Sequence, residues 1–201
     1  MRRERPKIER SPVPSWDRLF ETAAHQEGLF TTRQAADAGY SPQLLDHYLR
    51  IRWVVRVRRG IYRLVHFRAG EHADFVVAWL WSEQSGVVSH QTALGLHGLT
   101  DLLRWPIHLT VPLAWRMRRL QVPTDVTLHY ADLSPSDRTW RGPVPVTSPR
   151  RTLSDGGTTG LSPEELRRVL ARALERGLVA RSELAPFERV LGARAGLGSS
   201  P

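Results

Sequence analysis

Apolar residues recur at helical spacing near the start of the chain. The first such segment ends near Gly28 and is defined by four residues: Trp16, Leu19, Phe20 and Ala23. Their three- and four-residue intervals predict an amphipathic helix. Thr31 with Gln34 fits a capping box, which predicts a second helix that Gly39 ends.

A third helix and a hairpin follow. Ser41 before Pro42 predicts the start of a helix to about Arg50. It is expected to bury one apolar stripe: Leu44, Leu45, Tyr48 and Leu49. Two alternating stretches, 53–58 and 61–65, are then separated by Arg59-Gly60, which predicts a β-hairpin. Three helices and a hairpin in this order predict a winged helix-turn-helix.

The second half of the chain mixes helices and strands. Apolar density predicts a helix over 71–81, and Ser89 is expected to cap another helix that runs to His97. Ser-Pro pairs predict the starts of two further helices at Ser148 and Ser162, the first ended by Gly156-Gly157. Strands are expected at 107–111, 126–131 and 144–147.

These patterns predict an α+β chain with two folded domains. We expect a flexible basic arm at 1–14, a winged helix-turn-helix domain at 15–68, a small mixed α+β domain at 69–190 and a disordered tail at 191–201.

Positive charge is concentrated in the first domain. The net charge is +9, and residues 1–68 hold 14 Lys+Arg against 7 Asp+Glu. Seven arginines and no acidic residue lie between Arg50 and Arg68. A bias confined to one segment indicates an anionic polymer or surface as partner. General arginine enrichment is the alternative, but it does not explain the concentration.

The composition limits the cellular location of the protein and the kinds of chemical site that it can contain. The chain has no cysteine, which excludes disulfides and thiolate metal sites. No apolar run approaches the ~20 residues that span a bilayer, and the charged N-terminus is not followed by an apolar signal core. We therefore expect a cytoplasmic protein without membrane contact.

The third helix is the expected recognition helix. In this motif the second helix enters the major groove and the wing lies along the backbone or the minor groove. The burial pattern points Gln43, Asp46, His47 and Arg50 outward, and Gln and Arg suit adenine and guanine edges. Protein contacts alone are the alternative use of such a fold. The expected DNA-binding residues are Thr32, Arg33, Ser41, Gln43, His47, Arg50, Arg56, Arg58, Arg59 and Arg63.

No enzyme site can be assembled from the sequence. There is no Gly-x-Ser-x-Gly elbow, no Asp-x-Asp pair and, beyond Lys7, no lysine for a nuclease signature. His90 and His97 lie about two helical turns apart without a carboxylate at ligand spacing, so core packing is the favoured interpretation. We expect no catalytic residue, no metal site and no cofactor.

Stretches of both domains resemble the AbiEi antitoxin family. The first domain carries the likeness in Gly28–Ala36, Gly39–Ser41 and Val57–Leu64, and the second in Ser89–Leu99 and Thr147–Asp155. The likeness covers roughly residues 16–185. It implies a type IV toxin–antitoxin regulator that represses its own operon through the winged helix, with the operator expected to contain inverted repeats. It also implies action against a nucleotidyltransferase toxin without a stable complex.

Exposed arginines of the second domain are the candidates for antitoxicity: Arg150, Arg151, Arg168, Arg172 and Arg176. The last three form an i, i+4, i+8 stripe for which a solvated helix face is the simpler interpretation. A regulator whose second domain senses a ligand or a partner, without antitoxin activity, is the alternative function.

Overall fold

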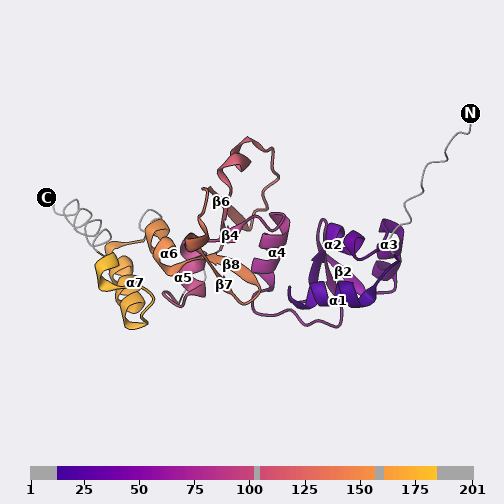
Figure 1. Ribbon diagram of the computed structural model, residues 1–201, viewed down its shortest axis with the longest axis horizontal. Helices are drawn as coiled ribbons and strands as arrows, with labels where there is room; N and C mark the ends of the chain where they lie inside the picture. Colours follow the sequence, from indigo (N-terminus) through magenta and orange to yellow (C-terminus); the bar gives the residue numbers. More distant parts are fainter. Residues whose placement is uncertain (1–12, 102–104, 157–160, 185–201) are drawn as a thin grey trace, which may run out of the picture. The chain divides into compact units, whose positions relative to one another are not determined.

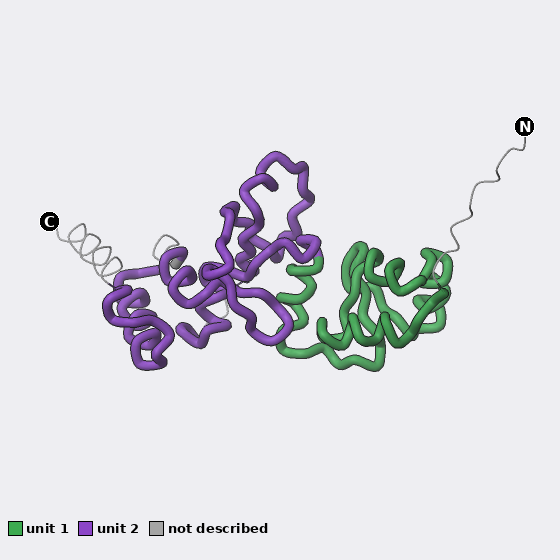
Figure 2. Tube along the Cα trace, in the orientation of Figure 1, with its two compact units in different colours: residues 1–80 green, residues 81–201 purple. Residues whose placement is uncertain are grey.

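The computed structural model describes residues 13–101, 105–156 and 161–184. Residues 1–80 and 81–201 form two compact units (Figure 2). The predicted domain boundary at 68/69 stays a prediction. Most of the predicted arm and all of the predicted tail lie outside the described residues.

The first unit begins with three helices and a small sheet (Figure 1). The helices are α1 (Trp16–Ala24), α2 (Thr32–Asp37) and α3 (Pro42–Arg50), and the strands are β1 (Leu29–Thr31), β2 (Val54–Arg58) and β3 (Ile61–Leu64). Both β1 and β2 pair antiparallel with β3, which is central. The predicted winged-helix arrangement is confirmed, with β1 as an unpredicted third strand.

One apolar core holds these elements together. Leu19 and Ala23 of α1, Leu45 of α3 and Tyr62 and Leu64 of β3 all belong to it. Burying a large aliphatic side chain is worth about 1.5–3 kcal/mol. The first helix ends at Ala24 rather than near Gly28, because the chain must turn into β1.

The predicted hairpin is confirmed, and Val54 is the buried residue of β2. Trp53 and Val57 are exposed. The register shifts between Arg56 and Arg58, so a bulge interrupts the regular alternation towards the turn. The alternation in the sequence does not say which of the two sets of side chains on β2 faces the core. In the structure, the pairing of β2 with β3 determines this.

The segment between the wing and the second unit contains α4 (Ala73–Trp81). It begins two residues later than the predicted 71–81 segment. His72 N–H donates to Glu27 Oε1 at 3.3 Å, which ties the segment before α4 to the end of the first helical region. Residues 75–80 of α4 are all buried.

A mixed sheet is the centre of the second unit (Figure 1). Its order is β6 (Val126–Tyr130), β5 (Ile107–Val111), β4 (Val87–Val88), β8 (Val144–Thr147) and β7 (Arg138–Arg141). The pairs β4–β8 and β5–β6 are parallel, and β4–β5 and β7–β8 are antiparallel. Strands β5 and β8 match their predicted bounds, β6 ends one residue early, and β4 and β7 were not predicted.

Helices α5 (His90–Leu96), α6 (Pro149–Gly156) and α7 (Pro163–Glu175) complete the second unit, with short 3-10 turns at Leu113–Met117, Pro135–Asp137 and Arg181–Glu183. α5 contacts β5 and β8, α6 contacts α5, and α7 contacts α6. A leucine-rich cluster from α5, α6 and α7 forms their common core. The α+β class predicted from the sequence is confirmed.

Candidate nucleic-acid interface

Side-chain caps fix the two helices of the motif. Gln34 N–H donates to Thr31 Oγ1 at 3.2 Å, and Thr31 N–H donates to Gln34 Oε1 at 2.8 Å, so the predicted capping box is formed. Ser41 Oγ accepts from Leu44 N–H at 3.2 Å and caps α3. Ser41, expected to contact DNA, therefore already has a structural role at the start of α3.

The turn between α2 and α3 depends on a left-handed glycine. Gly39 has φ 91°, and its N–H donates to Ala36 O at 2.9 Å. Tyr40 N–H then donates to Ala35 O at 2.9 Å, which satisfies a second carbonyl at the end of α2. Burial raises the pKa of Tyr40, whose ring packs edge-on against Tyr48 of α3. These contacts hold the start of α3 against the end of α2.

α3 presents one polar face to solvent. Gln43, Asp46, His47 and Arg50 are all exposed, while Leu45 is buried. Tyr48 packs against Trp16 and Trp53 on the inner side. On this face Arg50 Nε and Asp46 Oδ2 form an ion pair at 3.9 Å, and both side chains are more than 70% exposed. Such an exposed pair contributes little and can open when a ligand approaches.

The wing turn is attached to the start of α2. Thr32 N–H donates to Gly60 O at 3.0 Å, and Thr32 Oγ1 donates to the same carbonyl at 3.4 Å. Arg33, next in α2, and Arg59, in the turn, are exposed. The tip of the hairpin is thus held beside the helix-turn-helix rather than extending alone.

The other wing arginines are more constrained. Arg56 is exposed, but its Nη2 donates to Tyr62 Oη at 3.3 Å and its guanidinium lies 5.6 Å from the Tyr62 ring centre. Arg58 is half-buried beside the bulge. Arg63 is half-buried on central strand β3, paired with Leu29 and Val55, so it does not lie at the tip.

A groove of about 400 Å³ runs between α3 and the wing. Its lining includes Gln43 and Asp46 of α3, Thr32 of α2, and Arg56 and Tyr62 of the hairpin. Hydroxyl and guanidinium donors therefore line the groove beside the exposed face of α3. Such donors suit phosphate oxygens.

Residues 17–65, which hold these elements, match the family model described as a transcriptional regulator, AbiEi antitoxin. This part of the chain is therefore similar to the regulator domain of AbiEi antitoxins. The chain is also similar to the crystal structure of the Rv2827c protein from Mycobacterium tuberculosis, with 17% identity and a TM-score of 0.44. That similarity covers 83% of this chain and 74% of the other. No curated protein matches the sequence.

The matched residues, 17–65, coincide with the basic part of the chain and with the first-domain resemblance seen in the sequence. Transcriptional regulators of this kind act on DNA, so the class of partner expected from the charge pattern is supported. Within the described residues, no helix is long and apolar enough to cross a membrane.

Beyond residues 17–65, most of the arginines expected to act in antitoxicity have local partners in the structure. Arg172 makes a bidentate pair with Asp101, at 2.9 and 2.8 Å, and Arg176 Nη1 donates to His97 O at 3.2 Å. Arg168 is exposed on the same helix. The i, i+4, i+8 stripe on α7 is therefore partly a connection to the end of α5.

The two arginines at the start of α6 also differ in their exposure and in how closely they contact acidic partners. Arg150 is exposed and approaches Glu183 at 3.8 Å. Arg151 is half-buried and donates to Asp155 Oδ1 at 2.9 Å, with Asp137 at 3.8 Å. Its guanidinium therefore pairs within α6 and also approaches Asp137 in the 3-10 turn Pro135–Asp137.

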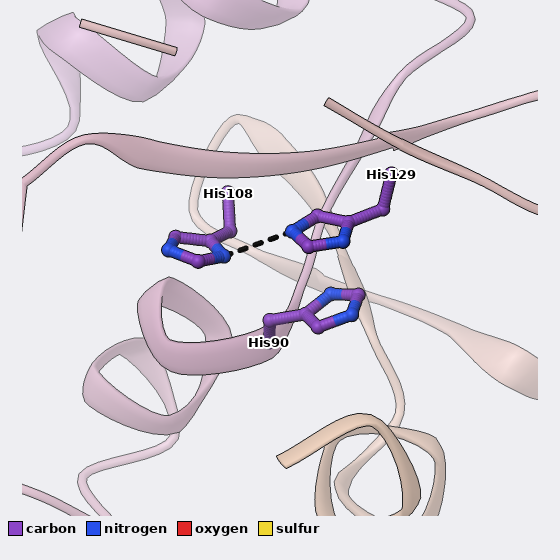
Figure 3. Close-up of side chains that lie close together, drawn as sticks. All are labelled: His90, His108 and His129. Atoms are coloured by element: carbon purple, nitrogen blue, oxygen red, sulfur yellow. Dashed lines mark hydrogen bonds between the residues drawn. The ribbon is translucent and has the colours of Figure 1, made fainter. Parts of the chain in front are cut away.

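Sequence spacing missed a cluster of three histidines: His90, His108 and His129 (Figure 3). One ring nitrogen of each lies within 4.8 Å of the others. His97, the histidine considered with His90 on spacing grounds, instead donates from Nε2 to Thr147 O at 2.7 Å. A search for histidines at alternate positions of neighbouring strands would have found His108 and His129.

Proposed function

We propose that the first unit binds duplex DNA with α3 in the major groove and the wing turn against the phosphate backbone. The observation that carries this proposal is the exposed face of Gln43, His47 and Arg50, beside the exposed Arg59 in the attached wing. The AbiEi match over residues 17–65 supports the same assignment.

The residue types on α3 suit base reading. Gln43 can pair bidentately with adenine and Arg50 with guanine, and Asp46 can accept from the cytosine amino group. Arg50 would leave its long contact with Asp46 to do so, which costs little because both are exposed. Arg33, Arg56 and Arg59 supply positive charge to the phosphates on either side.

We further propose that the bound DNA is the operator of the chain's own gene, with inverted repeats, and that the protein is the antitoxin of a type IV toxin–antitoxin pair. The family description names both regulation and antitoxin, which supports this finer assignment. The toxin partner would be a nucleotidyltransferase opposed without a stable complex, in the cytoplasm. A regulator with a sensing second unit and no antitoxin role is the alternative.

The test is binding of the full chain to its upstream duplex over a salt series. Neutralising about four to six phosphates predicts that log K falls against log salt with a slope of about −4 to −5 per protomer. A flat salt dependence, or no duplex binding at low salt, would refute DNA binding by this unit.

Variants separate sequence reading from general affinity. Replacing Gln43, His47 and Arg50 together by Ala is expected to erase the footprint's sequence preference, at about 1–3 kcal/mol for each good base contact. Arg59→Ala should weaken binding to all sequences alike and reduce the salt slope by about 1. An unchanged footprint in the triple variant would show that α3 is not the reading helix.

A further inference from the structure

Three histidines from separate segments meet on one face of the sheet in the second unit (Figure 3). In the parallel β5–β6 pair, His108 lies opposite Thr127, and His129 lies opposite Thr110. Residues two apart share a face, so His108 and His129 point to the same side. His90 is the first residue of α5, which contacts β5.

The ring nitrogens are close to ligand spacing. His108 Nδ1 and His129 Nε2 are 2.9 Å apart, and one nitrogen of His90 lies within 4.8 Å of a nitrogen of each. Zinc bound tetrahedrally at 2.0–2.1 Å holds its ligand atoms about 3.3 Å apart. The His90 and His129 rings stack with centres 3.5 Å apart and 15° between planes, so binding requires these rings to rotate until their lone pairs converge.

Neutral imidazoles are the form that binds metals. Burial lowers the pKa of both His90 and His129 to about 4, and that of His108 below its ordinary value. At neutral pH no proton has to be driven from a cationic ring before coordination. His90 is buried but His108 and His129 are half-buried, so solvent and an ion have access from their side.

Hydroxyl groups orient His90. Its Nδ1 lies 2.9 Å from Ser89 Oγ, which also accepts from Thr110 Oγ1 at 2.8 Å. When Nδ1–H donates to Ser89, the Nε2 lone pair is free for a metal, the usual arrangement behind a histidine ligand. Ser89 therefore does not cap α5 with its side chain, contrary to the sequence expectation.

Charged groups around the cluster are balanced. The charge of Asp155 acts to raise the pKa of His129, whereas the charge of Arg151 acts to lower the pKa of His90. Arg151 Nε and Asp155 Oδ1 are themselves paired at 2.9 Å. The carboxylate attracts a dication and the paired guanidinium repels it, so the imidazole nitrogens, not these charges, supply the binding.

His90 also has an unusual backbone. Its φ is 53°, in the left-handed region that residues other than glycine rarely adopt. Strained residues of this kind concentrate at functional sites, because only a functional or packing requirement preserves them. In this backbone conformation the His90 ring stacks on that of His129.

We propose that the second unit binds one Zn²⁺ ion through His90, His108 and His129, with solvent in the remaining position. Imidazole nitrogens select zinc and related transition metals over magnesium or calcium, which prefer oxygen ligands. The ion joins the start of α5 to β5 and β6 and replaces the hydrogen bond between His108 and His129. This site is independent of the DNA-binding face.

The test uses the full chain, freed of any affinity tag, stripped with a chelator and titrated with Zn²⁺. We expect one ion per chain by elemental analysis and calorimetry, and a rise in melting temperature of roughly 5 °C at a hundredfold excess over Kd. Co²⁺ should give the visible absorption of a four-coordinate histidine site. Absence of bound metal in the wild type would overturn the proposal.

Variants identify the ligands. His108→Gln and His129→Gln should each weaken Zn²⁺ binding by at least about a hundredfold. His97→Gln is the matched control, buried in the same unit but outside the cluster, and should bind zinc as the wild type does. Equal binding by all three variants would refute the assignment.

Histidine NMR covers the case in which a variant does not fold. On addition of Zn²⁺ to the wild type, the ring signals of His90, His108 and His129 should shift together at one equivalent. Shifts confined to exposed histidines such as His66 would assign the metal to adventitious surface binding and overturn the site.

Discussion

The N–H of Thr32 donates to the carbonyl of Gly60 at 3.0 Å, so the first residue of α2 holds the turn of the wing. The turn requires φ 75° at Gly60, a left-handed value. A Cβ built at this position meets only Thr32 Oγ1, at 3.7 Å, so the backbone angle rather than crowding restricts the residue. The wing therefore depends on a glycine for conformational reasons.

Gly60→Ala should consequently destabilise the first unit by about 1–2 kcal/mol, whereas Gly60→Asn should cost less because Asn tolerates left-handed backbone. Hydrogen exchange of peptides within 17–65 measures the effect without interference from the second unit. Equal losses for Ala and Asn would show that side-chain volume, not φ, sets the requirement.

The arginine stripe on α7 should separate into a position that is hydrogen-bonded to Asp101, Arg172, and an exposed position, Arg168, that acts on Asp101 only through its charge. Arg172→Glu removes the bidentate pair with Asp101 and places two carboxylates together, so the melting temperature of the second unit should fall. Arg168→Glu changes an exposed side chain and should stay within about 0.5 kcal/mol of the wild type. Calorimetry of the full chain measures both.

The charge swap Asp101→Arg with Arg172→Glu is the control, because it restores an ion pair and should recover most of the loss. If Arg172→Glu alone leaves the melting temperature unchanged, the pair is not structural. Arg168→Glu is then the cleaner variant for growth rescue against a cognate toxin, since any lost rescue cannot be attributed to unfolding.

His97 should make the second unit sensitive to mild acid. Burial is the main cause that lowers the pKa of His97, and Arg141, whose Nε donates to Nδ1 at 3.3 Å, lowers it further. The Nε2–H bond to Thr147 O opposes the shift, and Arg176 faces the His97 carbonyl from α7. The neutral ring is therefore the form compatible with the fold.

Because the folded pKa lies below the unfolded value of about 6.5, the unfolded chain takes up the proton first as the pH falls. The stability that neutral His97 contributes is complete above that pH and is lost progressively below it. His97→Gln can still donate to Thr147 but cannot titrate. Between pH 7 and pH 5 the wild type should lose more stability than the variant in calorimetric scans, and parallel curves would contradict the prediction.

Local rules in the sequence determined much of the first unit. Thr31 with Gln34 and Ser41 with Pro42 act within one helical turn, so they define the starts of α2 and α3 without reference to the rest of the chain. The exposed face of α3 follows from the same periodicity, and the concentration of arginines in 50–68 indicated an anionic partner. These features depend only on residues that are close in sequence, so they can be predicted without knowing the tertiary structure.

Only the tertiary structure decided which distant residues meet. The short strands β1, β4 and β7 exist because neighbouring strands pair with them, and their few residues carry no distinct pattern. His108 and His129 lie 21 positions apart and approach only through the parallel register of β5 and β6. Asp101 and Arg172 are separated by 71 positions and meet because α7 packs near the end of α5. The periodicity of the sequence shows which face of a helix or strand is apolar. The pairing of strands and the packing of helices that are distant in sequence determine what that face contacts.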